Sequence, residues 1–236
     1  MKLLKAMAIA FSIYSKIPVP QFEWKEEDME YMMCFFPWIG GVIGMFFFGW
    51  AVLCEKFAVG NVCYALIGAA IPLMISGGFH VDGYMDTMDA FHSYQSREKK
   101  LEILKDSHIG AFAAIMLALY YMIDIAAISE IHTQKAVSAV AAVFFLARCF
   151  SGIAVMTLQP AKKEGLLYTF ASSAQKVRVK AALYFQAALC VAIMLLVSGW
   201  YGAAAIGAAL LSFFYFKKKS YKELGGITGD TAGFFV

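Results

Sequence analysis

Three carboxylates stand close together in the polar stretch from Gly77 to Gly110, within a chain that is otherwise very apolar. Asp82, Asp86 and Asp89 are spaced i, i+4 and i+7, so in a helix they would lie along one stripe of its surface. Like charges in such a stripe repel one another unless a cation lies between them, and Mg²⁺ prefers carboxylate oxygens. The spacing therefore favours a Mg²⁺ site over a solvated helix face that happens to be acidic.

Four polar segments carry residue types that suit phosphoryl transfer. Acids can hold Mg²⁺, Lys and Arg can neutralise phosphate charge, and glycines let backbone N–H groups approach oxygens. No Walker A, G-x-S-x-G or H-E-x-x-H sequence is present, and the histidines are too scattered for a zinc site. The residues alone thus predict a Mg²⁺-dependent enzyme that moves a phosphate-bearing group. The segments are His80–Asp89, Lys105–Gly110, Ala161–Leu166 and Gly225–Asp230.

Composition decides the class of protein that must position these residues. The chain has 236 residues, of which 61% are hydrophobic and 16% charged, whereas soluble domains carry about a quarter charged residues. It is therefore predicted to be an integral membrane protein. A net charge of +3 gives no support to a nucleic-acid partner. The five cysteines form no C-x-x-C pair and read as small apolar core residues.

We predict an all-α integral membrane protein, a polytopic helical bundle that forms one catalytic domain over residues 1–236. Residues 1–20 are expected to be an amphipathic interfacial helix, 79–108 a cytoplasmic acidic catalytic loop, and 217–236 a cytoplasmic tail. Gly40, Gly41 and Gly44 predict a close contact between helices. Six apolar runs are long enough to span a bilayer, and a longer chain would add a seventh span. The runs are Cys34–Cys54, Asn61–Gly78, Ile109–Ser129, Ala136–Thr157, Ala181–Ser198 and Trp200–Phe216.

The distribution of positive charge predicts the orientation of these spans. Of the 20 Lys and Arg residues, only Lys56 and Lys135 fall on one side and Arg148 lies within a span; the remaining 17 share the other side with every polar motif. Such asymmetry indicates that this side is cytoplasmic. Arg148 is placed to be a phosphate ligand, and Asp124 is expected to pair with a neighbouring helix or face a cavity.

A set of motifs along most of the chain resembles the cobalamin synthase family, the adenosylcobinamide-GDP ribazoletransferases. Two departures from the family pattern are Lys16 and His108, since Arg is usual at both positions. The motifs are F-x-x-x-x-K-I-P-V-P (Phe11–Pro20), F-P-x-x-G-x-x-x-G (Phe36–Gly44), G-G-F-H-V-D-G-Y-M-D-T-M-D (Gly77–Asp89), K-D-S-H-I-G (Lys105–Gly110), K-E-G-L (Lys163–Leu166) and G-G-I-T-G-D (Gly225–Asp230).

The resemblance implies the assembly of the nucleotide loop of vitamin B12. Adenosylcobinamide-GDP and α-ribazole, or its 5′-phosphate, would give adenosylcobalamin, or its 5′-phosphate, and GMP, with Mg²⁺ as cofactor. The expected location is the inner membrane of a prokaryotic cell, with the active site facing the cytoplasm. The partners would be these small molecules and the lipid bilayer, and the sequence leaves the oligomeric state open.

The candidate site residues follow from the motifs and this chemistry. Asp82, Asp86, Asp89 and Asp106 are assigned to Mg²⁺ and catalysis, although Asp89 could instead be the general base for the attacking hydroxyl. Lys105 is assigned a catalytic role in neutralising phosphate charge. Substrate or phosphate binding is assigned to His80, Gly83, Ser107, Arg148, Lys163, Thr228 and Asp230.

Three other functions compete with this reading. D-G-x-x-D-x-x-D partly matches the CDP-alcohol phosphotransferases, which act on lipids and release CMP rather than GMP. A cation-coupled transporter would need Asp82, Asp86 and Asp89 to line a path across the bilayer, whereas the charge distribution places them on one side. A structural scaffold would leave the acid stripe without a purpose.

Overall fold

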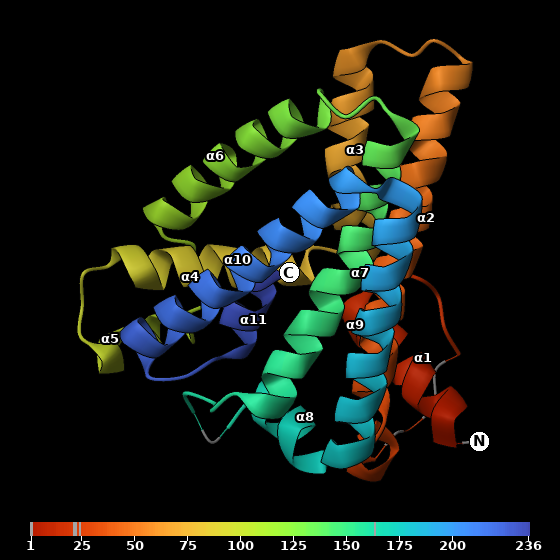
Figure 1. Ribbon diagram of the computed structural model, residues 1–236. Coiled ribbons are helices and arrows are strands. Elements are labelled where there is room, and N and C mark those ends of the chain that lie inside the picture. The colour runs from red at the N-terminus through yellow and green to blue at the C-terminus, as the bar shows by residue number, and fades with distance from the viewer. Residues whose placement is uncertain (1, 21–22, 24, 163) are drawn as a thin grey trace.

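The computed structural model describes residues 2–20, 23, 25–162 and 164–236, which fold into α-helices joined by short connections (Figure 1). Within these residues there is no β-sheet, only a single bridge between Pro160 and Ile227. The predicted all-α membrane fold is confirmed. The elements are α1 (Lys2–Tyr14), η1 (Glu26–Met29), α2 (Met32–Lys56), α3 (Asn61–Ser76), α4 (Phe79–His92), α5 (Arg97–Ile103), α6 (Ala111–Ile128), α7 (Gln134–Thr157), α8 (Leu166–Ser173), α9 (Lys176–Ser198), α10 (Trp200–Leu224) and α11 (Gly229–Phe235).

Helices α2 and α7 form the centre of the upright bundle in Figure 1. A side chain at Gly40 would collide with the carbonyl of Phe144, and one at Gly44 would collide with that of Ala141. The two backbones can approach this closely only because both positions lack a Cβ. The close helix contact predicted from these glycines is therefore confirmed.

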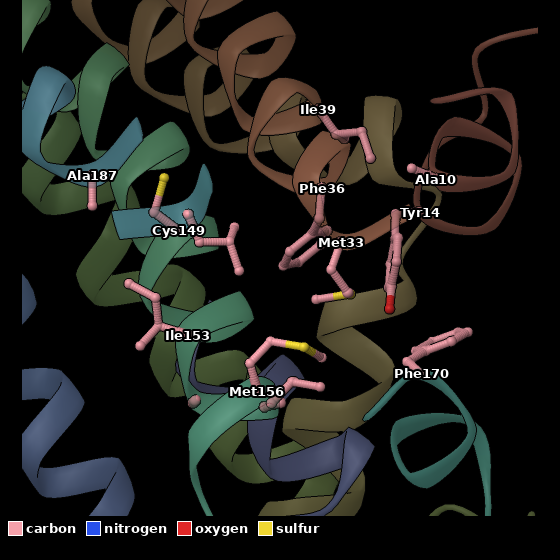
Figure 2. Close-up of a cluster of buried hydrophobic side chains, with 14 of the residues drawn as sticks. Ala10, Tyr14, Met33, Phe36, Ile39, Cys149, Ile153, Met156, Phe170 and Ala187 are labelled. Atoms are coloured by element: carbon pink, nitrogen blue, oxygen red, sulfur yellow. The ribbon is translucent and has the colours of Figure 1, made fainter. Parts of the chain in front are cut away.

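The largest hydrophobic core lies where α1, α2, α7 and α9 meet (Figure 2). Phe36 and Ile39 of α2 and Cys149 and Ile153 of α7 are all buried in this core. Tyr14 closes this core from the end of α1. The N-terminal helix is thus packed against the bundle by one face, while its Leu3 and Leu4 stay exposed. Its position at the membrane interface stays a prediction.

Four helices of the described chain, α2, α6, α7 and α9, are long and apolar enough to cross a bilayer. Helices α3 and α4 add a fifth span only if they are counted together, because they are bent by 98° at the break between them. The structure thus supports fewer spans than the six to seven predicted. The physical reason is that α3 has only 16 residues, and α10 carries lysines 217–219 within its second half.

The corner between α3 and α4 is made by two glycines. Gly77 and Gly78 have φ angles of +67° and +86°, a region that residues with a Cβ adopt at a cost. The side chain of Lys16 lies over Gly77 where a Cβ would be, and the Lys16 N–H donates to the carbonyl of Ile75 at 2.8 Å. This corner turns the acidic segment away from α3 as a helix rather than a loop, so the three acids do lie along one stripe.

The C-terminal segment returns to the acidic helix. Helix α11 packs along α4 (Figure 1), and α10 is tied to α5 by Glu223, whose carboxylate accepts hydrogen bonds from Lys100 and Lys219. Lys100 is buried, so its pairing with Glu223 avoids a buried unpaired charge. These contacts bring the G-G-I-T-G-D motif onto α4.

Candidate active site

One cavity of about 590 Å³ lies where α1, α2, α4, α7, α8 and α11 converge. This volume is in the range of small-ligand sites. Its acidic and basic side chains come from all four polar segments singled out in the sequence, and each segment contributes only some of its residues. The charged lining residues are Asp82, Lys105, Lys162, Glu164 and Asp230.

Asp82 and Asp230 meet at this cavity because α4 and α11 touch at Gly83. A Cβ at Gly83 would lie 2.9 Å from the carbonyl oxygen of Asp230 and 3.0 Å from its Cα. The crossing therefore has no room for a side chain. Gly83, predicted to bind substrate, lines the cavity and also sets how close the two carboxylates can come.

The start of α11 is fixed by its own threonines. The Thr228 hydroxyl accepts a hydrogen bond from the Thr231 N–H at 3.1 Å, and the Thr231 hydroxyl accepts one from the Thr228 N–H at 2.9 Å. This reciprocal cap satisfies N–H groups that a helix start leaves free. Asp230 lies in the first turn of α11. Burial raises the pKa of its carboxyl above the usual value, and the charge of Asp82 acts in the same direction.

The cations of the cavity come from two loops. Lys105 pairs with Glu164 at 2.5 Å between Nζ and Oε1, and Lys162 donates to the carbonyl of Leu101 at 2.6 Å. Burial and then the neighbouring Lys105 lower the pKa of Lys162, although Asp230 and Glu164 act to raise it. Two lysines held together in this way repel one another, and an anionic phosphate between them would relieve that repulsion.

The structure separates the three acids of the predicted stripe. Asp82 lines the cavity, whereas Asp86 does not, although the charges of Asp82 and Asp230 both act on it. The Asp89 carboxylate accepts the N–H groups of Gly110 and Ala113 at 2.6 Å and 2.9 Å. It therefore caps the start of α6. A metal or base role for Asp86 or Asp89 stays a prediction.

The other predicted residues divide between the cavity and its surroundings. His80, Lys105 and Thr228 line it together with Gly83 and Asp230. Asp106 and Ser107 are exposed and do not line it, and the Asp106 carboxylate accepts from the His108 N–H at 3.0 Å. Arg148 is buried in α7 behind the Phe36 ring, donates to the Phe144 carbonyl at 2.9 Å, and is not part of the lining. Lys163 lies outside the described residues.

Several lining residues were not predicted from the sequence. Lys162 and Glu164 belong to the third polar segment, and their charge was the available signal. Tyr14, Ser151 and Phe170 come from apolar helices, where nothing in the local sequence distinguishes a cavity residue from a core residue. Tyr14 does lie within the Phe11–Pro20 motif that carried the family resemblance.

The carboxylates fit a Mg²⁺ ion that is also held by substrate. Among the described residues, no group of three or more His, Cys, Asp or Glu side chains is arranged to hold a metal. Mg²⁺ is usually bound by one or two carboxylates together with substrate phosphates and water. Asp82 and Asp230 line one cavity with lysines beside them. They match a site that substrate phosphates complete, rather than one in which protein side chains supply all the ligands.

The sequence profile of cobalamin-5-phosphate synthase matches residues 6–236. The chain belongs to this family. It is therefore an enzyme, a transferase of cobalamin biosynthesis with membrane-spanning helices. This family assignment argues against the three alternatives, a lipid phosphotransferase, a transporter and a scaffold.

Curated relatives named adenosylcobinamide-GDP ribazoletransferase match almost the whole chain. The protein from Lachnoclostridium phytofermentans is 44% identical over 236 residues, which cover all of this chain and 90% of the relative. That from Clostridium botulinum strain Alaska E43 is 30% identical, covering 98% of this chain and 92% of the relative. The Fusobacterium nucleatum protein is 27% identical with the same coverage. No solved structure matches the chain.

Proposed function

We propose that this enzyme joins adenosylcobinamide-GDP to α-ribazole, or to its 5′-phosphate, and releases GMP. The names of the relatives support these substrates. The observation that carries the proposal is the single cavity that combines Asp82 and Asp230 with Lys105 and Lys162. Paired acids beside paired cations are what the transfer of a phosphate-linked group requires.

The reaction exchanges one P–O bond for another. A ribose hydroxyl of α-ribazole attacks the phosphorus that carries the corrinoid side chain, the bond from that phosphorus to the GMP oxygen breaks, and GMP leaves. Asp82 or Asp230 accepts the proton of the attacking hydroxyl. Lys105 and Lys162 neutralise the charge that develops on the departing phosphate. Mg²⁺ held by Asp82 and Asp230 would polarise the pyrophosphate oxygens.

The size of the cavity assigns parts of the substrates to it. About 590 Å³ accommodates a nucleoside and a pyrophosphate, whereas the corrin ring is a larger flat group. We therefore place the pyrophosphate that reacts in the cavity and the corrin ring outside it. The excess of Lys and Arg on the side of the polar motifs supports a cytoplasmic opening.

The test uses purified protein in lipid with both substrates and Mg²⁺, and follows GMP and completed corrinoid by mass spectrometry. Both products should appear together, stop with EDTA and return with excess Mg²⁺. Asp82→Asn should abolish turnover, whereas Asp124→Asn, which removes an acid of α6 away from the cavity lining, should leave it intact.

Two outcomes would contradict the proposal. GMP formed without any new corrinoid product would show a hydrolase instead of a transferase. A folded sample that forms neither product would leave the substrates unassigned, although the family assignment would stand.

A further inference from the structure

Four ring side chains of the cavity gather around Tyr14, and we call these five residues the aromatic recess. The Tyr14 ring centroid lies 4.5 Å from Phe36, 5.1 Å from Phe79, 5.8 Å from His80 and 6.3 Å from Phe170. All five residues line the cavity. In Figure 2, Tyr14 lies between Phe36 and Phe170, and its hydroxyl is directed to the side where Phe170 lies.

Two polar side chains of the recess make no hydrogen bond to any described residue, and one of their polar atoms is enclosed. Tyr14 and His80 are only 7% and 9% exposed, and in the part of the chain that the structure describes neither the Tyr14 hydroxyl nor a ring nitrogen of His80 makes a hydrogen bond; His80 Nδ1 is itself fully enclosed. Buried polar side chains almost always have partners. A ligand that fills the recess would supply them.

Resting on the proposed function, we propose that the aromatic recess binds the flat base of α-ribazole. This base is a dimethylated benzimidazole, which is apolar over both faces and has one free ring nitrogen. Its faces match the Phe36, Phe79 and Phe170 rings, and its ring nitrogen can accept a hydrogen bond from Tyr14 or His80. The recess and the base therefore match in shape, and both carry few polar groups.

The guanine of the other substrate fits the recess less well. Guanine presents several donors and acceptors at its edges, and each one left unpaired in an apolar site costs binding free energy. Besides Tyr14 and His80, the buried polar side chains that line the cavity are Ser151 and Thr228. The Ser151 hydroxyl already donates to the Ala232 carbonyl at 3.4 Å, and the Thr228 hydroxyl already accepts from the Thr231 N–H at 3.1 Å. The recess therefore selects the base with fewer polar groups.

The recess and the carboxylates are joined by the first turn of α4. His80 lies in the recess and Asp82, two residues later in the same helix, lines the same cavity. A nucleoside whose base occupies the recess can thus extend its ribose toward Asp82. The recess binds the acceptor and presents the attacking hydroxyl to the acidic end of the cavity.

The experiment separates the two substrates by steady-state kinetics. Phe170→Leu removes a ring and keeps an apolar side chain, and it should raise the KM for α-ribazole by about five-fold or more, as for the loss of one base-stacking ring. Tyr14→Phe removes only a hydroxyl and should raise it by about two- to ten-fold. The KM for adenosylcobinamide-GDP, and kcat at saturating α-ribazole, should stay within about two-fold of the wild type.

The matched control is Tyr168→Ala, which changes an aromatic residue on the same helix as Phe170 that does not line the cavity. Its KM values should not change. Free 5,6-dimethylbenzimidazole is the direct probe, because it carries the base without the ribose. It should inhibit in competition with α-ribazole and not in competition with adenosylcobinamide-GDP.

The outcomes distinguish this inference from the proposed function. If the variants raise the KM for adenosylcobinamide-GDP instead, or the free base competes with that substrate, the recess binds guanine and the inference is overturned. Unchanged KM values for both substrates would overturn it as well. A wild-type enzyme that forms no cobalamin from the two substrates would overturn the proposed function, and this inference with it.

Discussion

Replacing Gly83 by alanine should separate the two carboxylates of the cavity. The new Cβ would lie 2.9 Å from the Asp230 carbonyl oxygen and 3.0 Å from its Cα. Since favourable contacts between heavy atoms are about 3.5 Å or longer, the backbone at Asp230 must move away from α4 by about 0.5 Å. Both obstructing atoms belong to backbone, so no side-chain rotation relieves the contact.

Stability and activity should respond to this change very differently. Overpacking costs about 1–3 kcal/mol, but alanine is favoured over glycine within a helix by about 1 kcal/mol. The net loss of stability is therefore about 0–2 kcal/mol. A misplacement of 1 Å can lower a rate about 100-fold, so a shift of about 0.5 Å at Asp230 should lower kcat about ten-fold.

The measurement compares kcat and thermal unfolding in lipid or detergent. Gly207→Ala is the matched control, because it makes the same change within α10 at a position where no atom lies within 4 Å of the new Cβ. It should keep wild-type kcat. A Gly83→Ala enzyme with full kcat would refute the reasoning that this contact sets the position of Asp230.

Four further predictions concern the acids and their partners. Asp82→Asn should abolish turnover without loss of folded protein, whereas Asp89→Ala should lower the free energy of unfolding by about 1 kcal/mol through loss of the α6 cap, measured by thermal unfolding. Burial raises the Asp230 pKa and a bound cation would lower it; because only the ionised carboxylate binds Mg²⁺, the acid limb of the activity profile should move to lower pH as Mg²⁺ increases. Lys100→Met should lower the free energy of unfolding by about 1–3 kcal/mol. This is less than the cost of leaving a buried charge without any partner, because Glu223 still accepts a hydrogen bond from Lys219. An unchanged unfolding temperature would contradict this prediction.

The general fold could be predicted because its signals are local. Apolar runs of sufficient length and glycines at helix spacing report directly on α2 and α7. The number of spans was less predictable, since it depends on the direction in which a helix runs. The 98° bend between α3 and α4 comes from two glycines in left-handed conformations beside Lys16, and an apolar run alone does not reveal it.

The sequence predicted which segments form the candidate site better than it predicted which residues in them line the cavity. The sequence identifies Asp82, Lys105 and Asp230 through polar motifs, and the structure brings all three to one cavity. It could not distinguish Asp82 from Asp89, because both lie on the same stripe of α4. Only the position of α6 decides that Asp89 caps a helix start, and that position depends on tertiary packing.

Gly225 and Gly226 of the tail motif make tight contacts with protein atoms. A side chain at Gly225 would collide with the Arg97 guanidinium, and a Cβ at Gly226 would lie 2.6 Å from the Gln159 carbonyl oxygen. Beside them, the Ile227 N–H donates to that same carbonyl at 3.0 Å. These contacts hold the turn that leads into α11 against α5 and the end of α7. The motif therefore provides close backbone packing, and through it the approach of Asp230 to Asp82 across Gly83.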